Sequence, residues 1–340
     1  MRILYTGGGT LGSVTPLLAL AEKDGATDRL WIGTVDGPEK DYVTKQQIHF
    51  FGIKAFRLRR FFTLKTILEF PRLFLSYYQA KKIVKDFNPD IVITAGSFVG
   101  VPVCRASKSL GIPYVVIQLD VRPGLANRIL FSKASLIVVP HKDFTKKVLY
   151  PTVRVCGIPV SVEKGFVSHS QRPVIVVVGG GTGANWLNRF VGAYVDKLLA
   201  LGDVIHIQGN KDRSIALLHK SNYFTYFHES RERVLSSFKK ADIIITRAGM
   251  GTLSELAVLG KPAIIVPMPE SHQDDNAHFF VEHAAAVSVN QRDGFEQLFL
   301  CAKELLKNYK KQRNLSNNIS HIFPENSVLQ IRNALAEIHE

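Results

Sequence analysis

The stretch MRILYTGGGTLGS at residues 1–13 joins a short apolar run to a glycine-rich turn, and an apolar stretch at 14–21 follows it. The same pattern opens the second half of the chain at 173–184, before a helical pattern that begins at Trp186. Glycine lets a backbone approach an anion closely, and a helix N-terminus adds free N–H groups and about half a positive charge. The two turns therefore predict sites for a negatively charged nucleotide or diphosphate.

One such turn is a weak signal, but one in each half predicts an α/β fold with two Rossmann-like domains whose parallel sheets face each other across a cleft. Short apolar strand patterns alternate with helical patterns along both halves, as buried parallel strands require. We expect an N-terminal domain at 1–160, a C-terminal domain at 161–324, and a helix at 325–340 that packs back on the first domain. The strands are expected at 3–5, 29–32, 90–94, 114–118, 136–139, 174–178, 204–208, 243–246 and 263–266, and the helices at 65–87, 97–110, 186–199, 252–259 and 276–283.

Length and composition limit the classes of protein to which the chain can belong. A chain of 340 residues with 46% hydrophobic residues is long enough for two cores. The net charge of +14 favours an acidic partner, such as nucleic acid, an anionic membrane or a phosphate-rich substrate. The three cysteines are far apart and match no zinc spacing, which favours a reduced, intracellular setting. We expect no signal peptide and no spanning helix, because the chain enters a strand at once and no apolar run approaches the roughly 20 residues that spanning requires.

Gly7, Gly9 and Gly12 fit the spacing G-x-G-x-x-G and leave three interpretations open. In a dinucleotide oxidoreductase, Asp36 would be the acidic residue that binds the ribose, but such an enzyme does not need the second glycine turn. Alternatively, the glycines serve tight packing alone. The interpretation that we favour is recognition of a phosphate or diphosphate in the cleft.

The stretch 247–256 is the densest signal in the chain. It follows an apolar strand, and Thr252 and Glu255 fit a capping box that opens a helix. Glu255 either caps this helix or accepts hydrogen bonds from both hydroxyls of a ribose, which a carboxylate can do. The stretch 267–277 follows the next strand at the carboxyl edge of the sheet, where ligands bind. Its polar side chains either bind sugar hydroxyls or only cap the next helix.

Residues 54–85 contain nine basic residues, seven aromatic residues and a single acidic residue, Glu69. A buried helix would not carry so many cations, and a solvated helix would not carry so many phenylalanines. This combination suits an anionic membrane surface, where each Lys or Arg contributes about 1 kcal/mol. Nucleic acid is the competing partner, but we expect none because nothing else in the chain resembles a nucleic-acid module.

Six motifs in a fixed order carry a resemblance to one enzyme family. The chain resembles the MurG type of glycosyltransferase, the family that adds N-acetylglucosamine to undecaprenyl-diphospho-muramoyl-pentapeptide, over nearly its whole length. The last two motifs are fairly specific together, whereas the glycine turns alone are not. In the first half of the chain, residues 8–16 correspond to the family pattern G-G-T-G-G-H-x-x-P, residues 33–39 to G-T-x-x-x-x-E, and residues 96–102 to a glycine-containing turn. In the second half, residues 179–188 correspond to G-G-S-Q-G-A-x-x-L-N, residues 247–255 to R/S-x-G-x-x-T-x-x-E, and residues 272–277 to H-Q-x-x-N-A.

The chain departs from the family pattern mainly in its first half. Ser13 stands in place of the histidine of the first glycine loop, and Leu11 replaces one of its glycines. Ser161 stands where the family has an arginine near the donor diphosphate, and 117–120 replaces the pattern H-E-Q-N. The donor half of the pattern is thus better preserved than the acceptor half.

The resemblance implies a GT-B fold and an inverting transfer of N-acetylglucosamine from UDP-N-acetylglucosamine to an undecaprenyl-diphosphate-linked sugar-peptide, the step from lipid I to lipid II in peptidoglycan precursor synthesis. It implies a peripheral enzyme on the cytoplasmic face of the cell membrane, and we expect no cofactor and no metal.

With the histidine absent, we take Ser13 and Asp120 as catalytic candidates, and Asp120 as the base because it follows the strand at 114–118. The expected donor site is Gly181, Thr182, Gly183, Gly251, Thr252, Glu255, His272, Gln273 and Asn276. The expected acceptor diphosphate loops contain Gly9, Thr10, Gly12, Ser97 and Gly100. The expected membrane contacts are Arg59, Arg60, Phe61, Phe62, Lys65, Phe70, Arg72 and Phe74.

Two other classes of function remain open. One is a different enzyme on the same fold, either a glycolipid glycosyltransferase or a UDP-N-acetylglucosamine 2-epimerase. The basic aromatic segment argues against an epimerase, because a soluble epimerase does not need a segment that binds a membrane. The other class is a non-catalytic homologue that binds lipid or nucleotide, for which the substitutions at Ser13 and Ser161 are the best support.

Overall fold

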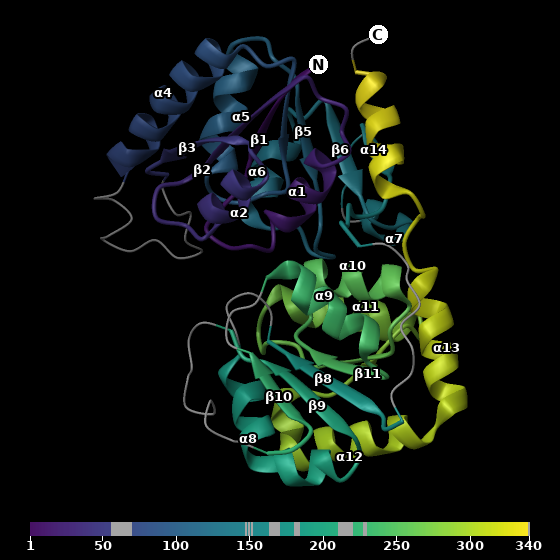
Figure 1. Cartoon of the computed structure of the whole chain (residues 1–340). Helices are drawn as coiled ribbons and strands as arrows, with labels where there is room; N and C mark the ends of the chain where they lie inside the picture. Colours follow the sequence, from purple (N-terminus) through teal and green to yellow (C-terminus); the bar gives the residue numbers. More distant parts are fainter. Residues whose placement is uncertain are drawn as a thin grey trace. The chain divides into compact units, whose positions relative to one another are not determined.

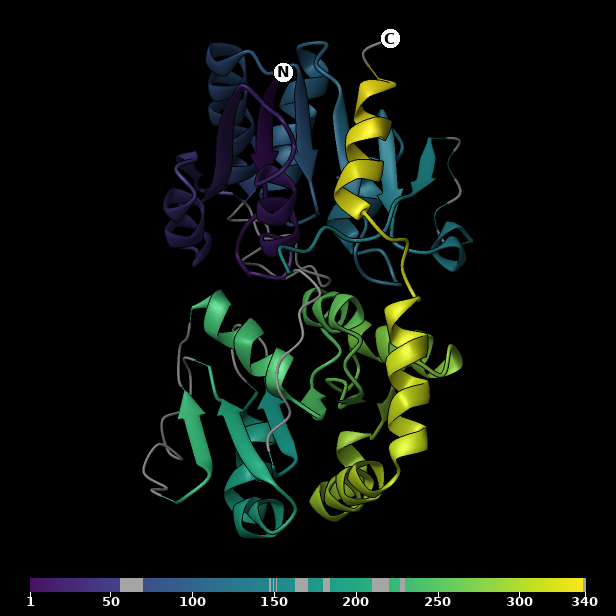
Figure 2. The ribbon, with the colours of Figure 1, turned by 45° about the vertical axis from the view of Figure 1, so that its right-hand side comes forward.

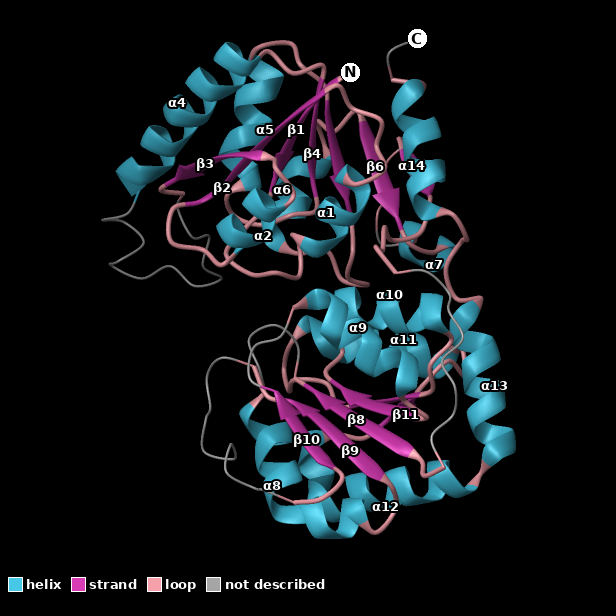
Figure 3. Cartoon of the chain, in the orientation of Figure 1, coloured by secondary structure: helices cyan, strands magenta, loops and turns pink. Residues whose placement is uncertain are grey.

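The computed structural model describes residues 1–55, 70–146, 148, 150, 152–162, 171–179, 184–209, 220–226 and 230–338, with the backbone alone at 70–73. The chain forms two compact units, Met1–Ser161 with Pro324–Glu340, and Val162–Phe323 (Figure 1). Each unit is built on one parallel sheet that is flanked by helices (Figure 3).

The sheet of the first unit has seven strands in the order β3-β2-β1-β4-β5-β6-β7. All neighbouring strands run parallel, and Leu4 in the middle of β1 pairs with Leu30 of β2 and Val92 of β4. Its strands are β1 (Arg2–Thr6), β2 (Asp28–Thr34), β3 (His49–Ile53), β4 (Ile91–Thr94), β5 (Tyr114–Ile117), β6 (Leu136–Val139) and β7 (Val153–Val155).

Helices connect these strands in two directions away from β1. Because parallel crossovers are right-handed, α1 and α2 lie on the opposite face of the sheet from α4, α5 and α6. The last helix, α14, lies over β6 (Figure 2). There Gly157 has a φ of +79°, and its missing Cβ leaves room for the Ser327 side chain at the start of α14. The helices are α1 (Thr15–Ala21), α2 (Glu39–Lys45), α4 (Phe70–Phe87), α5 (Gly100–Ser109), α6 (Leu125–Phe131), α7 (Lys142–Thr145) and α14 (Ser327–Ala336).

The second unit repeats the arrangement with six parallel strands in the order β10-β9-β8-β11-β12-β13. Its strands are β8 (Val174–Val178), β9 (Asp203–Ile207), β10 (Tyr223–Tyr226), β11 (Ile243–Thr246), β12 (Ala263–Ile265) and β13 (Val287–Ser288). Its helices are α8 (Asn185–Leu199), α9 (Arg231–Lys240), α10 (Met250–Leu259), α11 (His272–Glu282), the short η1 (Gln291–Asp293), α12 (Gly294–Lys307) and α13 (Tyr309–Ser320).

The core of the second unit shows why its central strands are apolar throughout. Every side chain of β8 is buried, because helices cover both faces of a doubly wound sheet. On one face, α8 and α12 pack aromatic side chains together, with the Trp186 and Phe295 rings 4.8 Å apart and the Phe190 and Phe295 rings 5.8 Å apart. Full burial of one such ring contributes about 2–3 kcal/mol to folding.

The prediction of an α/β fold with two Rossmann-like, parallel-sheet domains is confirmed. The edge strands β3, β7, β10 and β13 are absent from the predicted set, because short and partly exposed strands lack the long apolar run of a central strand. The predicted start of a helix at Asn276 is wrong: α11 begins at His272, because Ser271 and Asp274 form a capping box there. No helix in the described ranges combines the length and the apolar character needed to cross a membrane.

Candidate functional site

The strand order reverses between β1 and β4 in the first sheet and between β8 and β11 in the second. In α/β sheets, ligands bind at the carboxyl edge beside such a reversal. The first glycine turn follows β1 and the turn with Ser97 follows β4. In the second unit, Gly179 follows β8 and the stretch 247–249 follows β11. The topology therefore brings the first glycine turn and the stretch 247–249 to the reversal points of their sheets.

Glu39 holds the first glycine turn against the end of β2. Its carboxylate is fully buried and accepts hydrogen bonds from the Gly9 N–H at 3.1 Å and the Thr34 N–H at 2.6 Å. The Thr34 hydroxyl also donates to Glu39 Oε1. Gly9 has a φ of +81°, which favours glycine, and a Cβ there would lie 2.7 Å from the Phe98 ring. Sequence reasoning matched Glu39 to a family motif but gave it no role.

Three buried hydroxyl oxygens at this edge, those of Thr6, Ser13 and Ser97, have no hydrogen-bond partner among the described residues. Thr6 ends β1, Ser13 precedes α1, and Ser97 has the unusual φ of +111° after β4. A buried polar group without a partner costs about 1–3 kcal/mol, so a cluster of them requires an explanation. The hydroxyls can donate to an oxygen-rich anion, which agrees with the expected role of this edge.

The other expected acceptor residues lie around the same turn. Thr10 and Gly12 are exposed between β1 and α1. Gly100 begins α5 and is buried, and a Cβ at this position would lie 2.7 Å from the Thr94 hydroxyl. A larger residue at Gly100 would therefore push α5 away from the end of β4.

Asp120 lies in the turn that follows β5, on the same carboxyl edge. Gln118 shapes this turn, because its amide donates to the Asp120 backbone carbonyl while its side-chain oxygen accepts from Asn127 Nδ2 at 2.7 Å. The Asp120 side chain is half-buried. In the strand order, β4 lies between β5 and β1, the strand that precedes Ser13.

Glu255 does not cap α10, and the predicted capping box with Thr252 is wrong. The helix begins at Met250 after Gly249, whose extended conformation makes it the N-cap, so Thr252 lies inside the first turn. Glu255 is 6% exposed and forms an ion pair with Arg231 of α9, with Arg231 Nη1 2.7 Å from Glu255 Oε1. Burial raises the pKa of Glu255, and Arg231 opposes this rise. Gly251 lies beside Thr252 in the same first turn.

The other residues expected in the donor site lie at the N-terminus of α11. Ser271 and Asp274 cap the helix, so Gln273 and Asn276 are not needed as caps. The Gln273 side-chain oxygen accepts from the Met268 N–H at 3.0 Å. Asn276 is fully buried and donates to the Ala248 carbonyl at 3.0 Å, which ties α11 to the stretch that follows β11. His272, the first residue of α11, is half-buried.

Arg247 fixes the end of β12, a role that the sequence does not suggest. Its Nη1 donates to the carbonyls of Val266 at 3.0 Å and Pro267 at 3.2 Å, and its Nη2 donates to Gln291 Oε1 at 3.0 Å. Burial lowers the pKa of the guanidinium. Arg247 thus supports the stretch that leads to His272.

A buried histidine joins α8 to β9 in the second unit. His206 Nε2 lies 3.1 Å from Asn188 Oδ1, and Nδ1 lies 2.9 Å from the Tyr223 hydroxyl. Because the Asn188 oxygen can only accept, His206 carries its proton on Nε2. Burial lowers the pKa of His206 to about 3. Sequence reasoning missed this group because His206 lies within an apolar strand pattern.

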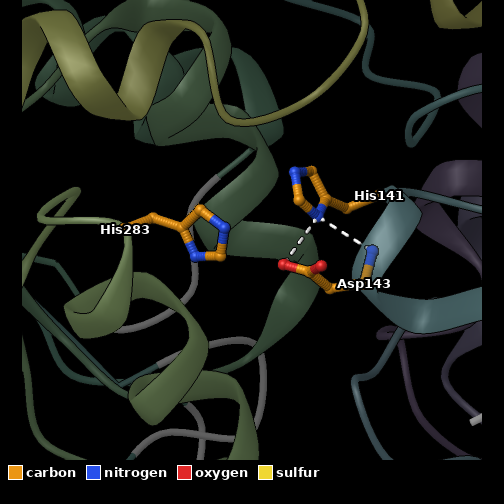
Figure 4. Close-up of side chains that lie close together, drawn as sticks. All are labelled: His141, Asp143 and His283. Carbon is orange, nitrogen blue, oxygen red and sulfur yellow. Dashed lines mark hydrogen bonds and ion pairs between the residues drawn. The ribbon is translucent and has the colours of Figure 1, made fainter. Parts of the chain in front are cut away.

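His141 and Asp143 form another polar group in the first unit, at the start of α7 (Figure 4). His141 caps this short helix, since its Nδ1 accepts from the Asp143 N–H at 3.2 Å and lies 3.4 Å from Asp143 Oδ2. Figure 4 also draws His283, which belongs to the second unit and contacts the Phe279 carbonyl at 2.8 Å through its Nδ1. Each histidine thus has a local structural partner in its own unit.

The comparisons with known proteins agree with this geometry. Residues 3–139 match the glycosyltransferase family 28 N-terminal domain, and residues 174–330 match the glycosyltransferase family 28 C-terminal domain. A relative from Lachnospira eligens is 30% identical over 99% of both chains, and it is named "UDP-N-acetylglucosamine--N-acetylmuramyl-(pentapeptide) pyrophosphoryl-undecaprenol N-acetylglucosamine transferase". The chain belongs to glycosyltransferase family 28. The resemblance carried by the six sequence motifs is therefore confirmed.

Solved structures show that the family 28 fold is shared with other enzymes. The crystal structure of Acinetobacter baumannii MurG is 21% identical, with a TM-score of 0.74 over 99% of each chain. A UDP-GlcNAc 2-epimerase from Neisseria meningitidis, bound to UDP-GlcNAc, is 14% identical, with a TM-score of 0.72 over 99% of this chain and 100% of that chain. At such identities these likenesses show the GT-B fold alone.

Part of the site expected from the family 28 pattern lies outside the described residues. This holds for Gly181, Thr182 and Gly183 of the second glycine turn. It also holds for the expected membrane residues Arg59, Arg60, Phe61, Phe62 and Lys65, and for the side chains of Phe70 and Arg72 at the start of α4. The described part of α4 exposes Phe74 by 56%, Leu75 by 62% and Tyr78 by 65%.

Proposed function

We propose that this family 28 protein is an inverting glycosyltransferase that moves N-acetylglucosamine from UDP-N-acetylglucosamine to a lipid-diphosphate acceptor, the step from lipid I to lipid II. The observation that carries the proposal is similarity to a relative of that name over 99% of both chains. The buried carboxylate of Glu255 and the unpartnered hydroxyls of the first unit provide independent support.

The second unit is proposed to bind the donor. Glu255 accepts hydrogen bonds from the ribose hydroxyls, and Gln273 binds hydroxyls of the transferred sugar. The N-terminus of α10, with Gly251 and Thr252 in its first turn, faces the diphosphate with its free N–H groups. The glycine motif with Gly181, Thr182 and Gly183 is assigned to the same diphosphate from the sequence. These groups stabilise the negative charge that grows on UDP as it leaves. His272 and Asn276 complete the donor site.

The first unit is proposed to bind the acceptor. The hydroxyls of Ser13 and Ser97 donate to the lipid diphosphate, and Thr10, Gly12 and Gly100 shape the loops around it. Two properties support this assignment: both serine oxygens are buried without a partner, and Glu39 fixes the adjacent turn. A turn that is already ordered binds an anion without a further loss of conformational entropy.

The chemical step is a single displacement. The acceptor hydroxyl oxygen forms a bond to the anomeric carbon, the bond from that carbon to the UDP oxygen breaks with its electron pair on UDP, and the hydroxyl proton moves to a base. We propose Asp120 as the base, because it is a half-buried carboxylate on the carboxyl edge of the first sheet. Removal of a general base typically costs about 10²–10⁴ in rate, so Asp120→Asn should lower kcat by this factor with little change in donor KM. Full turnover of Asp120→Asn at saturating substrate would exclude the assignment.

A peripheral position on the cytoplasmic face of the membrane is also proposed. Exposed Phe74, Leu75 and Tyr78 of α4 support it, together with the basic residues of the same helix and of the preceding segment. Apolar side chains among cations suit a surface of anionic lipid. Vesicles with phosphatidylglycerol should therefore bind the protein more tightly than vesicles of phosphatidylcholine alone, and added salt should weaken the binding.

The decisive experiment is UDP release from UDP-N-acetylglucosamine with and without a short-chain diphospho-muramoyl-pentapeptide lipid. Release that depends on the lipid is the expected result. Consumption of the nucleotide sugar without an acceptor would instead indicate an epimerase, an activity that the same fold supports in the Neisseria meningitidis enzyme. Binding of the donor without any turnover would indicate a non-catalytic homologue.

A further inference from the structure

Arg231 and Glu255 form an ion pair between two neighbouring helices of the second unit. Arg231 is the first residue of α9, and Glu255 lies on α10, which packs against α9. The guanidinium Nη1 is 2.7 Å from Glu255 Oε1, and the side chains are 28% and 8% exposed. Among the described residues, no hydrogen bond is made to Glu255 Oε2, and the closest contact of Arg231 is to Oε1.

The arginine is poorly suited to its own helix. The N-terminus of a helix carries partial positive charge and favours acidic residues, and Glu232 in the same turn follows that rule. Arg231 at the first position opposes it. A buried ion pair is also weak evidence for stability, since apolar residues of similar size often serve as well. The pair therefore has an unfavourable local placement and no clear benefit for folding, which indicates a role at the donor edge.

The electrostatics give the arginine a specific effect on Glu255. Burial raises the pKa of this carboxyl, and Arg231 lowers it both through its charge and through its hydrogen bond. The helices packed against α10 also carry Glu232, Arg233, Lys239 and Lys240 on α9, and Lys310, Lys311 and Arg313 on α13. Among these and the other described residues, Arg231 alone affects the pKa of Glu255.

We propose that Arg231 is a positioning residue of the donor site, which holds Glu255 through Oε1 and keeps it ionised so that Oε2 can accept hydrogen bonds from the ribose diol. This inference rests on the proposed function, because it assigns a partner to the residue proposed to bind the ribose. It makes recognition of the ribose depend on a residue that touches the nucleotide only through Glu255. An ionised carboxylate accepts only, whereas a protonated carboxyl presents one O–H and makes weaker bonds to hydroxyl donors.

The test compares UDP with 2′,3′-dideoxy-UDP, which lacks both ribose hydroxyls. The affinity of each is measured by calorimetry from pH 5.5 to 8.5 for the full chain and for Arg231→Gln and Arg231→Lys. We expect Arg231→Gln to weaken UDP about 10-fold at pH 7 and to leave 2′,3′-dideoxy-UDP unchanged, because loss of one charge-assisted contact is worth about one decade in affinity. Without the cation the pKa of Glu255 rises further, so the variant loses UDP affinity at a higher pH as the solution is acidified. Arg231→Lys keeps the charge and should restore most of the affinity.

Two further variants separate a positioning role from a structural one. In a Glu255→Gln background, Arg231→Gln should have no further effect on UDP, because its target is already gone. Lys240→Gln removes the same charge from the exposed far end of α9 and should change neither affinity nor the pH profile. If Arg231→Gln does not fold, the Arg231→Lys variant provides the test by itself. A lysine holds a carboxylate less well than an arginine, so the affinity for UDP should fall a few-fold while the affinity for 2′,3′-dideoxy-UDP stays the same.

The outcomes that would overturn the inference are distinct from failure of the proposed function. Equal losses for UDP and 2′,3′-dideoxy-UDP in the Arg231 variants would mean that Arg231 acts on another part of the nucleotide. Unchanged affinities and an unchanged pH profile would mean that it has no role in binding. In both cases the proposed function stands. If the unaltered chain binds neither UDP nor UDP-N-acetylglucosamine, the proposed function itself fails.

Discussion

Glu39 in the first unit and Glu255 in the second are both buried carboxylates near a reversal point of their sheet, but they are stabilised in different ways. Glu39 accepts from neutral donors only in its described contacts, two backbone N–H groups and a hydroxyl, and both of its oxygens are engaged. Glu255 is paired with a guanidinium through one oxygen. The difference separates a carboxylate that orders a loop from one that remains able to accept hydrogen bonds from a ligand.

The two units therefore prepare their ligand edges by different means. In the first, the buried carboxylate fixes the backbone, and the hydroxyls of Thr6, Ser13 and Ser97 at the carboxyl edge have no partner among the described residues. In the second, the hydroxyl of Thr246 at the end of β11 likewise has no partner among the described residues, and the edge adds a carboxylate, Glu255, that is paired with Arg231. Hydroxyls suit an anionic diphosphate, because they donate hydrogen bonds. A carboxylate suits a sugar diol, because it accepts them.

The largest expected effect is loss of stability in the first unit on Glu39→Ala. The substitution leaves the N–H groups of Gly9 and Thr34 and the Thr34 hydroxyl without an acceptor, at about 1–3 kcal/mol for each buried group, or about 4 kcal/mol together. Scanning calorimetry with and without UDP should assign this loss to the transition that UDP does not raise, because a ligand stabilises only the unit that binds it. Asp36→Ala, which removes an exposed carboxylate nearby, should leave that transition unchanged.

If Glu39→Ala instead destabilised only the UDP-sensitive transition, Glu39 would not be the residue that orders the first unit. The contrast between Glu39 as a loop-ordering carboxylate and Glu255 as a ligand-binding carboxylate would then be wrong.

The second effect is loss of donor affinity on Glu255→Ala, which should exceed the effect on stability. Two hydrogen bonds to an ionised group are worth about 3 kcal/mol together, so we expect UDP to bind about 100-fold more weakly. Isothermal titration calorimetry measures this loss. Glu282→Ala, which removes an exposed carboxylate from the end of α11, is the matched control and should leave UDP affinity intact. Unchanged UDP affinity in Glu255→Ala would refute the ribose role and would make the two glutamates alike.

The third effect is a loss of stability of the second unit in acid through His206. The unfolded imidazole binds a proton near pH 6.5, whereas burial lowers the pKa of His206 to about 3 in the folded unit. The unfolded state thus binds more protons between these values, and stability falls as the pH falls below about 6.5, by about 1.4 kcal/mol per pH unit. His206→Gln should flatten this dependence in urea unfolding of the UDP-sensitive transition. His278→Gln, at an exposed position, should not flatten it.

The smallest effect on stability, and the sharpest test of the unpartnered hydroxyls, is expected from Ser13→Ala. The buried hydroxyl has no partner to lose, so the melting temperature should stay the same or rise slightly. Turnover with the lipid acceptor should fall about 5-fold if the hydroxyl donates to the acceptor, since one such bond is worth about 1 kcal/mol. Ser109→Ala, whose hydroxyl donates to the Ala106 carbonyl near the end of α5, should leave turnover intact. A clear fall in stability for Ser13→Ala would indicate a structural hydroxyl.

The sequence predicted the central strands because they are apolar on both faces and end at glycine turns, as β1 and β8 do. It predicted the carboxyl edge as the ligand site because the motifs follow those strands. It failed where a contact joins residues from different elements. Local spacing predicts a capping box of Thr252 and Glu255 that does not form, and Arg231, the partner of Glu255, comes from another helix. His206 was missed because its Asn188 and Tyr223 partners are brought to it only by the fold.

The return of the chain to the first unit at α14 has a consequence for biosynthesis. The second unit is one continuous segment, Val162–Phe323, whereas the first is completed by Pro324–Glu340. The buried side chains of Ile331 and Leu335 on α14 therefore reach the first unit only after the whole second unit has been translated. Although it is made later, the second unit can finish folding earlier. A nascent chain that stops before Pro324 would carry a complete second unit and a first unit with the β6 end of its sheet uncovered, which is a surface for chaperones to recognise.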